Sequence, residues 1–162
     1  MWYEILIKNE FADYFINSDL SVQDTAEKQK ADEMLDGLKK IVKGVSNAWR
    51  HYYDPTFKGH KWVHRDGLKY YSQIALDAFD FCCTQIHLSK AKSLPEIWHS
   101  IPNNPGESKY SIDISQLTAE QCAILIIYQF WARMGVSTLK DFQESGKLKE
   151  YLIALKNKSL NP

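Results

Sequence analysis

The chain has 162 residues, of which 44% are hydrophobic and 25% charged, and its 20 basic and 20 acidic residues leave no formal net charge. This size and composition predict one globular domain over residues 1–162. They argue against a membrane span, because the longest strongly apolar stretch, "CAILIIYQFWA", is shorter than the roughly 20 residues that a bilayer requires. The three Cys make a poor disulfide framework, and the start "MWYEILIKNE" is unlike a signal peptide, so we expect a soluble cytoplasmic protein without membrane contact.

Two helices are predicted in the first third of the chain. Tyr and Phe residues recur at helical spacing over residues 3–15, although the apolar run 2–7 could instead be a strand. Residues 24–53 give the clearest pattern: Asp24 can cap the start, and Pro55 ends the helix because the residue before a proline disfavours the α region. The apolar positions of this helix recur every three or four residues and form one stripe: Leu35, Leu38, Ile41, Val42, Val45, Trp49 and Tyr52.

Two glycines interrupt this long predicted helix. Gly37 and Gly44 lie seven residues apart and therefore nearly on one face. Each costs a helix up to about 1 kcal/mol relative to alanine. Two explanations stay open: the glycines let a neighbouring helix approach closely, or they mark a weak point or kink.

The middle of the chain is predicted to hold a loop followed by two helices. Residues 55–66 are broken by Gly59 and are predicted to form the loop. Residues 67–89 carry apolar side chains around much of the helix circumference, which indicates burial on more than one side. A short helix is predicted from Ser93, which can cap it, to about Ile101.

The last third is predicted to contain the core helix. Residues 118–121, "TAEQ", form a capping box, and the helix that they open, near 119–134, is apolar all round. Two short helices follow, one on each side of Gly146. The predicted fold is all-α: a compact bundle of about six helices around the 119–134 helix, with at most a minor short β-pair near 2–7 and 110–114.

The zero net charge hides an asymmetry between neighbouring segments. Residues 1–38 hold nine acids and three bases, a net charge of −6, whereas residues 39–70 hold eight bases and two acids, a net charge of +6. Part of this pattern has a structural explanation, because acidic residues favour the start of the long predicted helix and lysines favour its end.

Four residues have the spacing of a possible zinc site. His60 and His64 are four residues apart, as are Cys83 and His87, and four such ligands would suit tetrahedral zinc if both pairs were helical. Gly59 argues against a helix at the first pair, and a Cys in an apolar helix is commonly a buried small hydrophobe. We therefore predict no metal and no cofactor.

The remaining motifs favour structural roles. Glu96 and His99 have the spacing of a di-iron ligand pair, but the motif occurs once where such sites need two. Asp77 and Asp80 are expected to form a solvated stripe rather than an acid–base pair. No G-x-S-x-G, Walker or G-x-G-x-x-G motif occurs, so we predict no catalytic residues.

The segment 49–65, "WRHYYDPTFKGHKWVHR", is the predicted binding site. It combines five aromatic residues, three His and four Lys or Arg. Trp49 and Tyr52 continue the apolar stripe, but no helical period explains the loop, and loops on a rigid scaffold often carry function. The predicted partner-binding residues are Arg50, Phe57, Lys58, His60, Lys61, Trp62, His64 and Arg65.

Three functions are compatible with this segment. The first is binding of a protein partner, with inhibition or neutralisation of that partner in the manner of immunity proteins or inhibitors of defence enzymes; Trp, Tyr and Arg dominate such interfaces. The second is nucleic-acid binding through residues 39–70, because cations replace phosphate counterions and rings stack bases. The third is a small enzyme with an acid–base pocket of His51, His60, His64 and Tyr residues. The first is preferred.

Overall fold

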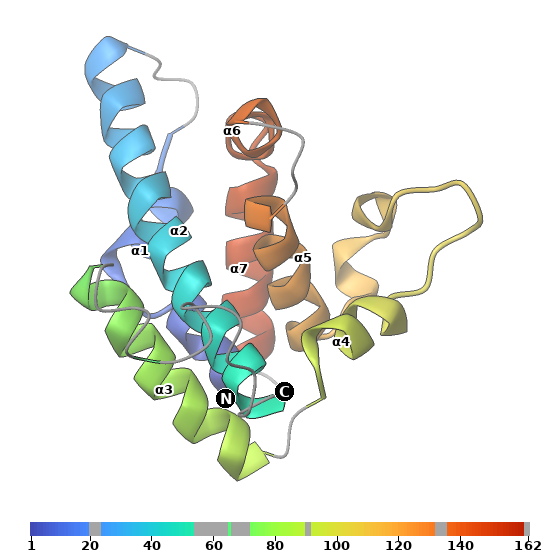
Figure 1. Cartoon of the computed structure of the whole chain (residues 1–162). Helices are drawn as coiled ribbons and strands as arrows, with labels where there is room; N and C mark the ends of the chain where they lie inside the picture. Colours follow the sequence, from blue (N-terminus) through green and yellow to red (C-terminus); the bar gives the residue numbers. More distant parts are fainter. Residues whose placement is uncertain (20–23, 54–64, 66–71, 90–91, 132–135, 161–162) are drawn as a thin grey trace.

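The computed structural model describes residues 1–19, 24–53, 65, 72–89, 92–131 and 136–160. Within these ranges the chain is helical and contains no strand, which confirms the predicted all-α bundle (Figure 1). Short 3₁₀ helices accompany the α-helices in the described residues, among them η1 (Trp2–Leu6), η3 (Lys109–Ser111) and η4 (Ile114–Gln116). The α-helices are α1 (Glu10–Asn17), α2 (Thr25–Tyr53), α3 (Gln73–Ser89), α4 (Leu94–Ser100), α5 (Ala119–Trp131), α6 (Val136–Glu144) and α7 (Lys147–Leu160).

Side-chain caps start the helices where the sequence predicts. The Asp24 carboxylate accepts a hydrogen bond of 2.8 Å from the Glu27 amide, at the start of α2. Ser93 accepts from the amide three residues later and opens α4. The capping box of α5 is complete: the Thr118 hydroxyl accepts from the Gln121 amide at 3.1 Å, and the Gln121 side chain accepts from the Thr118 amide at 2.9 Å.

The two segments that could have been strands are 3₁₀ turns instead. Residues 2–6 form η1, and the single helix expected over 3–15 is interrupted because Asn9 caps α1, accepting from the Ala12 amide at 2.8 Å. Near 110–114, Ser108 and Asp113 cap η3 and η4 by accepting from amides two residues ahead. Such local bonds to side chains occupy amides that a β-ladder would need.

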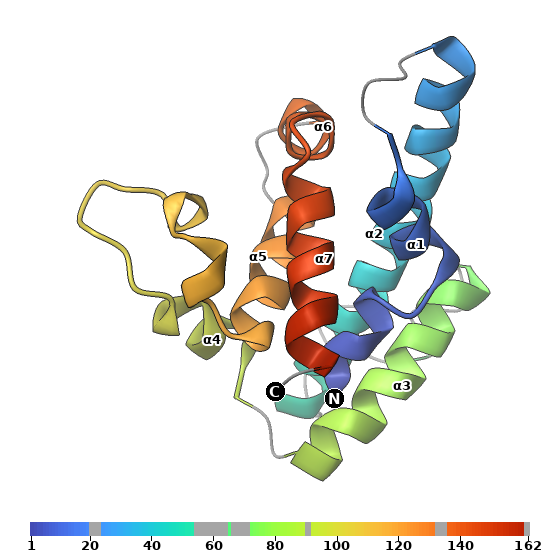
Figure 2. The same cartoon turned by 180° about the vertical axis from the view of Figure 1, so that it is seen from behind.

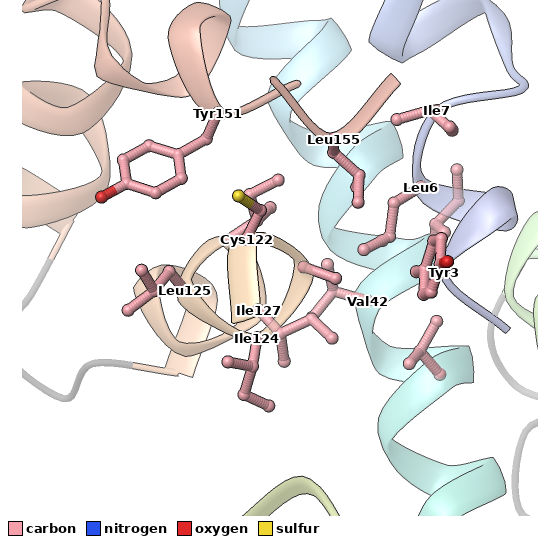
Figure 3. Close-up of a cluster of buried hydrophobic side chains, with 14 of the residues drawn as sticks. Tyr3, Leu6, Ile7, Val42, Cys122, Ile124, Leu125, Ile127, Tyr151 and Leu155 are labelled. Carbon is pink, nitrogen blue, oxygen red and sulfur yellow. The ribbon is translucent and has the colours of Figure 1, made fainter. Parts of the chain in front are cut away.

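Helix α5 lies at the centre of the core, as predicted. Its residues Cys122 through Ile127 are all 0% exposed, because α5 contacts α2, α4, α6, α7 and η1. In Figure 3, apolar side chains from the N-terminal segment, α2 and α7 surround it: Tyr3, Leu6, Ile7, Val42, Tyr151 and Leu155.

The N-terminal turn η1 joins three helices. The indole of Trp2, only 1% exposed, donates a hydrogen bond of 3.3 Å to the Glu120 carboxylate of α5. Its ring centre lies 5.6 Å from that of Trp49 on α2, and its carbonyl oxygen accepts from the Cys82 thiol of α3. Trp2 thus connects the start of the chain to α2, α3 and α5, which lie far from it in the sequence.

Helices α2 and α3 run side by side, and glycine permits their close approach (Figures 1 and 2). A Cβ atom added to Gly44 would lie 2.5 Å from the Ala75 carbonyl oxygen and 2.7 Å from the Ala78 Cβ. Gly37 instead faces the ring of Phe11 on α1. Of the two explanations for these glycines, the structure supports close packing.

Two features at the edges of the bundle complete the fold. Asp24 and the first residues of α2, from Thr25 to Lys30, are all exposed, whereas the buried stripe of α2 begins at Leu35. The segment after α4 projects from the bundle (Figure 2). None of the helices in the described ranges is long and apolar enough to cross a membrane.

Candidate partner-binding surface

The structure describes two of the eight predicted binding residues. Arg50 lies in the last turn of α2, and Arg65 lies between α2 and α3. The other six fall outside the described residues, so their contribution stays a prediction: Phe57, Lys58, His60, Lys61, Trp62 and His64.

Arg65 is held by an ion pair on the surface of α3. Its Nε donates to both carboxylate oxygens of Asp80, at 3.1 and 3.2 Å, and both side chains are about half exposed. Exposed pairs of this kind contribute about 0–1 kcal/mol to stability. Asp77 accepts a hydrogen bond of 2.8 Å from the side-chain amide of Gln73, so the two aspartates have separate partners.

Arg50 begins a row of aromatic side chains that the sequence alone did not reveal. Its guanidinium carbon lies 5.7 Å from the centre of the Trp131 ring, a cation–π contact. The Trp131 ring lies 5.8 Å from that of Tyr128, and Tyr128 stacks on Trp98 with ring centres 4.3 Å apart. The Tyr110 ring lies 6.4 Å from that of Trp98.

Lys109 lies at the other end of the row. Its ammonium is 5.4 Å from the centre of the Trp98 ring. It also donates to the Ile101 carbonyl at 2.7 Å and to the Asn103 side chain at 3.3 Å, and thereby ties the segment after α4 to the end of that helix. We call this surface the aromatic face and define it by six residues: Arg50, Trp98, Lys109, Tyr110, Tyr128 and Trp131.

The aromatic face is partly exposed because α4 and α5 bury other residues than the aromatic ones that form it. Helix α4 buries Leu94 and Ile97, at 3% and 2% exposure, and leaves the next residue, Trp98, partly exposed. Helix α5 is fully buried from Cys122 to Ile127, and beyond this run Tyr128 and Trp131 are partly exposed. Packing of α4 on α5 then brings their outer aromatic residues together.

The phenols of the aromatic face are uncharged donors at neutral pH. Burial raises the pKa of Tyr128 above its usual value. Burial also raises the pKa of Tyr110, whose hydroxyl donates a hydrogen bond of 2.7 Å to the Leu125 carbonyl. The formal charges of the face are therefore those of its two cations.

Other aromatic residues extend from the end of α2. Trp49 is buried at 3% exposure, as the apolar stripe predicts, while Tyr53 is 47% exposed and stacks on it with ring centres 5.6 Å apart. The Tyr52 ring lies 5.1 Å from that of His87 on α3. His51 lies in the same turn with its ring centre 5.7 Å from that of Phe79, so the described histidine of the proposed acid–base pocket contacts an apolar ring.

The described half of the possible zinc site consists of Cys83 and His87 on α3. In the metal-free chain, burial and then the Asp80 charge raise the pKa of the Cys83 thiol to about 11. The described part of the chain contains no group of three or more His, Cys, Asp or Glu that could hold a metal ion. His60 and His64 lie outside it.

A separate cleft of about 460 Å³ lies between α1, α2 and α6. Tyr14 and Glu27 form part of its lining, and the Tyr14 hydroxyl donates to the Glu27 carboxylate at 3.4 Å. Burial and the Glu27 charge raise the pKa of Tyr14. The cleft is acidic, because its charged lining residues are Asp13, Asp19, Glu27, Asp32 and Glu144 against Lys28 and Lys140.

Comparison with known proteins adds no functional information: no protein-family model, curated protein or solved structure matches the chain.

Proposed function

We propose that this protein binds a protein partner through the aromatic face and inhibits or neutralises that partner by occupying it. The observation that carries the proposal is the row formed by Trp98, Tyr128 and Trp131, partly exposed and adjoined by Arg50. Trp, Tyr and Arg are the residue types that most often supply the binding energy of protein interfaces. Rings already packed against one another also lose little conformational freedom on binding.

The same geometry favours a protein over a nucleic acid. Stacking of a base requires an open ring face. Trp98 already contacts Tyr128 and the Lys109 ammonium, and Trp131 already carries the Arg50 guanidinium. The chain also lacks the strong positive net charge that is typical of nucleic-acid-binding domains.

The test is affinity capture of the tagged protein from its native cells, with variants of the aromatic face. Trp98→Ala and Trp131→Ala are compared with Leu88→Ala, which removes an apolar side chain that is 76% exposed on α3. We expect a stoichiometric partner with the wild type and with Leu88→Ala, and recovery reduced at least about tenfold with each Trp variant. Thermal unfolding of each variant controls for loss of the fold.

Two results would count against the proposal. Recovery of nucleic acid without any stoichiometric protein would favour the alternative function. A partner retained unchanged by both Trp variants would exclude the aromatic face as its binding surface.

A further inference from the structure

We infer that the segment of the partner that docks on the aromatic face is acidic, with a carboxylate at Arg50 and an apolar side chain on Trp131 and Tyr128. This inference rests on the proposed function and adds the chemistry of the partner to it. It is argued from the local contacts of the two cations and from the charge of the surrounding chain.

Of the two cations, Arg50 is the one that suits a carboxylate. The ammonium of Lys109 is already hydrogen-bonded to the Ile101 carbonyl and the Asn103 side chain. Arg50 is exposed, and its guanidinium lies over the Trp131 ring. A guanidinium presents five N–H donors in one plane, a fork that matches the two oxygens of a carboxylate. The cation–π contact with the ring restrains the guanidinium, and its exposure leaves N–H groups able to donate.

The charge of the surrounding chain also favours an anion. Arg50 belongs to the segment 39–70, which carries a net charge of +6 although the whole chain is neutral. Two of its described bases, Lys40 and Arg65, are ion-paired with Asp36 and Asp80, whereas Arg50 is exposed and can attract an oppositely charged partner. Burial and then the Glu96 carboxylate raise the pKa of Tyr53, and this negative charge near Tyr53 makes Arg50 the better place for a partner carboxylate.

The row beside Arg50 explains why the partner must also be apolar. Trp131 and Tyr128 offer partly exposed ring surface next to the guanidinium. Burial of this surface supplies affinity, and the charge pair then fixes the orientation of the partner. An amphipathic helix with leucines on one face and glutamates beside them combines the two requirements.

The probes are two synthetic 15-residue amphipathic peptides that share one leucine face, one with glutamates and one with lysines at the flanking positions. A 15-nucleotide oligo-dT is the third probe. Binding to the full chain is measured by calorimetry and by the fluorescence of the protein's tryptophans. We expect the glutamate peptide to bind at least about tenfold more tightly than the lysine peptide, as a desolvated charge pair requires.

The matched variants are Arg50→Glu and Lys39→Glu. Both reverse one exposed charge on α2 and change the net charge of the chain equally. We expect Arg50→Glu to abolish the preference for the glutamate peptide and Lys39→Glu to retain it. Equal losses in both variants would show a general electrostatic effect and would overturn a specific role for Arg50.

The other outcomes overturn the inference directly. Equal or tighter binding of the lysine peptide would do so, as would the absence of peptide binding at millimolar concentration. Binding of oligo-dT in place of the glutamate peptide would identify a nucleic acid as the occupant. Failure of the inference differs from failure of the proposed function, because a partner captured through Trp98 and Trp131 but insensitive to Arg50→Glu would contradict only the inference.

Discussion

Replacement of Gly44 by alanine is expected to force α2 and α3 apart. The added methyl group would lie 2.5 Å from the Ala75 carbonyl oxygen and 2.7 Å from the Ala78 Cβ, well inside ordinary contact distances. Neither atom can move by a side-chain rotation, so the helices themselves must shift. Overpacking of this kind costs about 1–3 kcal/mol, while the gain in helix propensity is at most about 1 kcal/mol.

We therefore expect Gly44→Ala to lower the free energy of unfolding by about 1–2 kcal/mol. For a chain of this length that corresponds to a fall in Tm of roughly 2–8 °C. Urea denaturation and thermal unfolding, both followed by circular dichroism, measure the change.

Gly37→Ala on the same helix is the matched control. Its methyl group would meet the outer atoms of the Phe11 ring, and Phe11 is partly exposed and can rotate. We expect this variant to be as stable as the wild type or up to about 1 kcal/mol more stable. The reasoning is refuted if Gly44→Ala is as stable as the wild type, or if the two variants change stability equally.

Two further predictions concern buried groups. Burial raises the pKa of Cys83 and of Cys122 from 9.0 to about 11. Between pH 9 and 11 the folded state therefore binds more protons than the unfolded state, and the free energy of unfolding should fall as the pH rises. Urea midpoints that stay constant from pH 8 to 11 would contradict this prediction. The Tyr151 hydroxyl is buried without a hydrogen-bond partner, so Tyr151→Phe should leave stability unchanged or raise it by up to about 1 kcal/mol, and a clear loss in urea denaturation would show that the hydroxyl is paired.

The helix starts could be predicted because their signals are local. Asp24, Ser93 and Thr118 each bond an amide three residues ahead, so a short stretch of sequence contains both partners. The central position of α5 could be predicted because a helix that is apolar all round must be buried. The 3₁₀ turn at residues 2–6 could not be predicted, because a short apolar run suits a strand or a helix equally well.

The aromatic face could be predicted only in part. Arg50 was expected from the cluster of basic and aromatic residues around it. Trp98, Tyr128 and Trp131 come from two other helices, and their contact depends on the packing of α4 against α5. A weaker signal was present: Tyr128 and Trp131 are three residues apart and follow the fully buried run of α5.

The burial of Trp2 has a consequence for the order of folding on the ribosome. Its indole bonds to Glu120, 118 residues later in the chain, and its ring packs against Trp49. At about 5–20 residues per second, synthesis of the intervening chain takes roughly 6–24 s. Until Glu120 has been synthesised, the indole of Trp2 lacks its hydrogen-bond partner on α5. The contacts of this turn with α2 and α3 can form earlier, whereas its hydrogen bond to α5 forms only once that helix has been made.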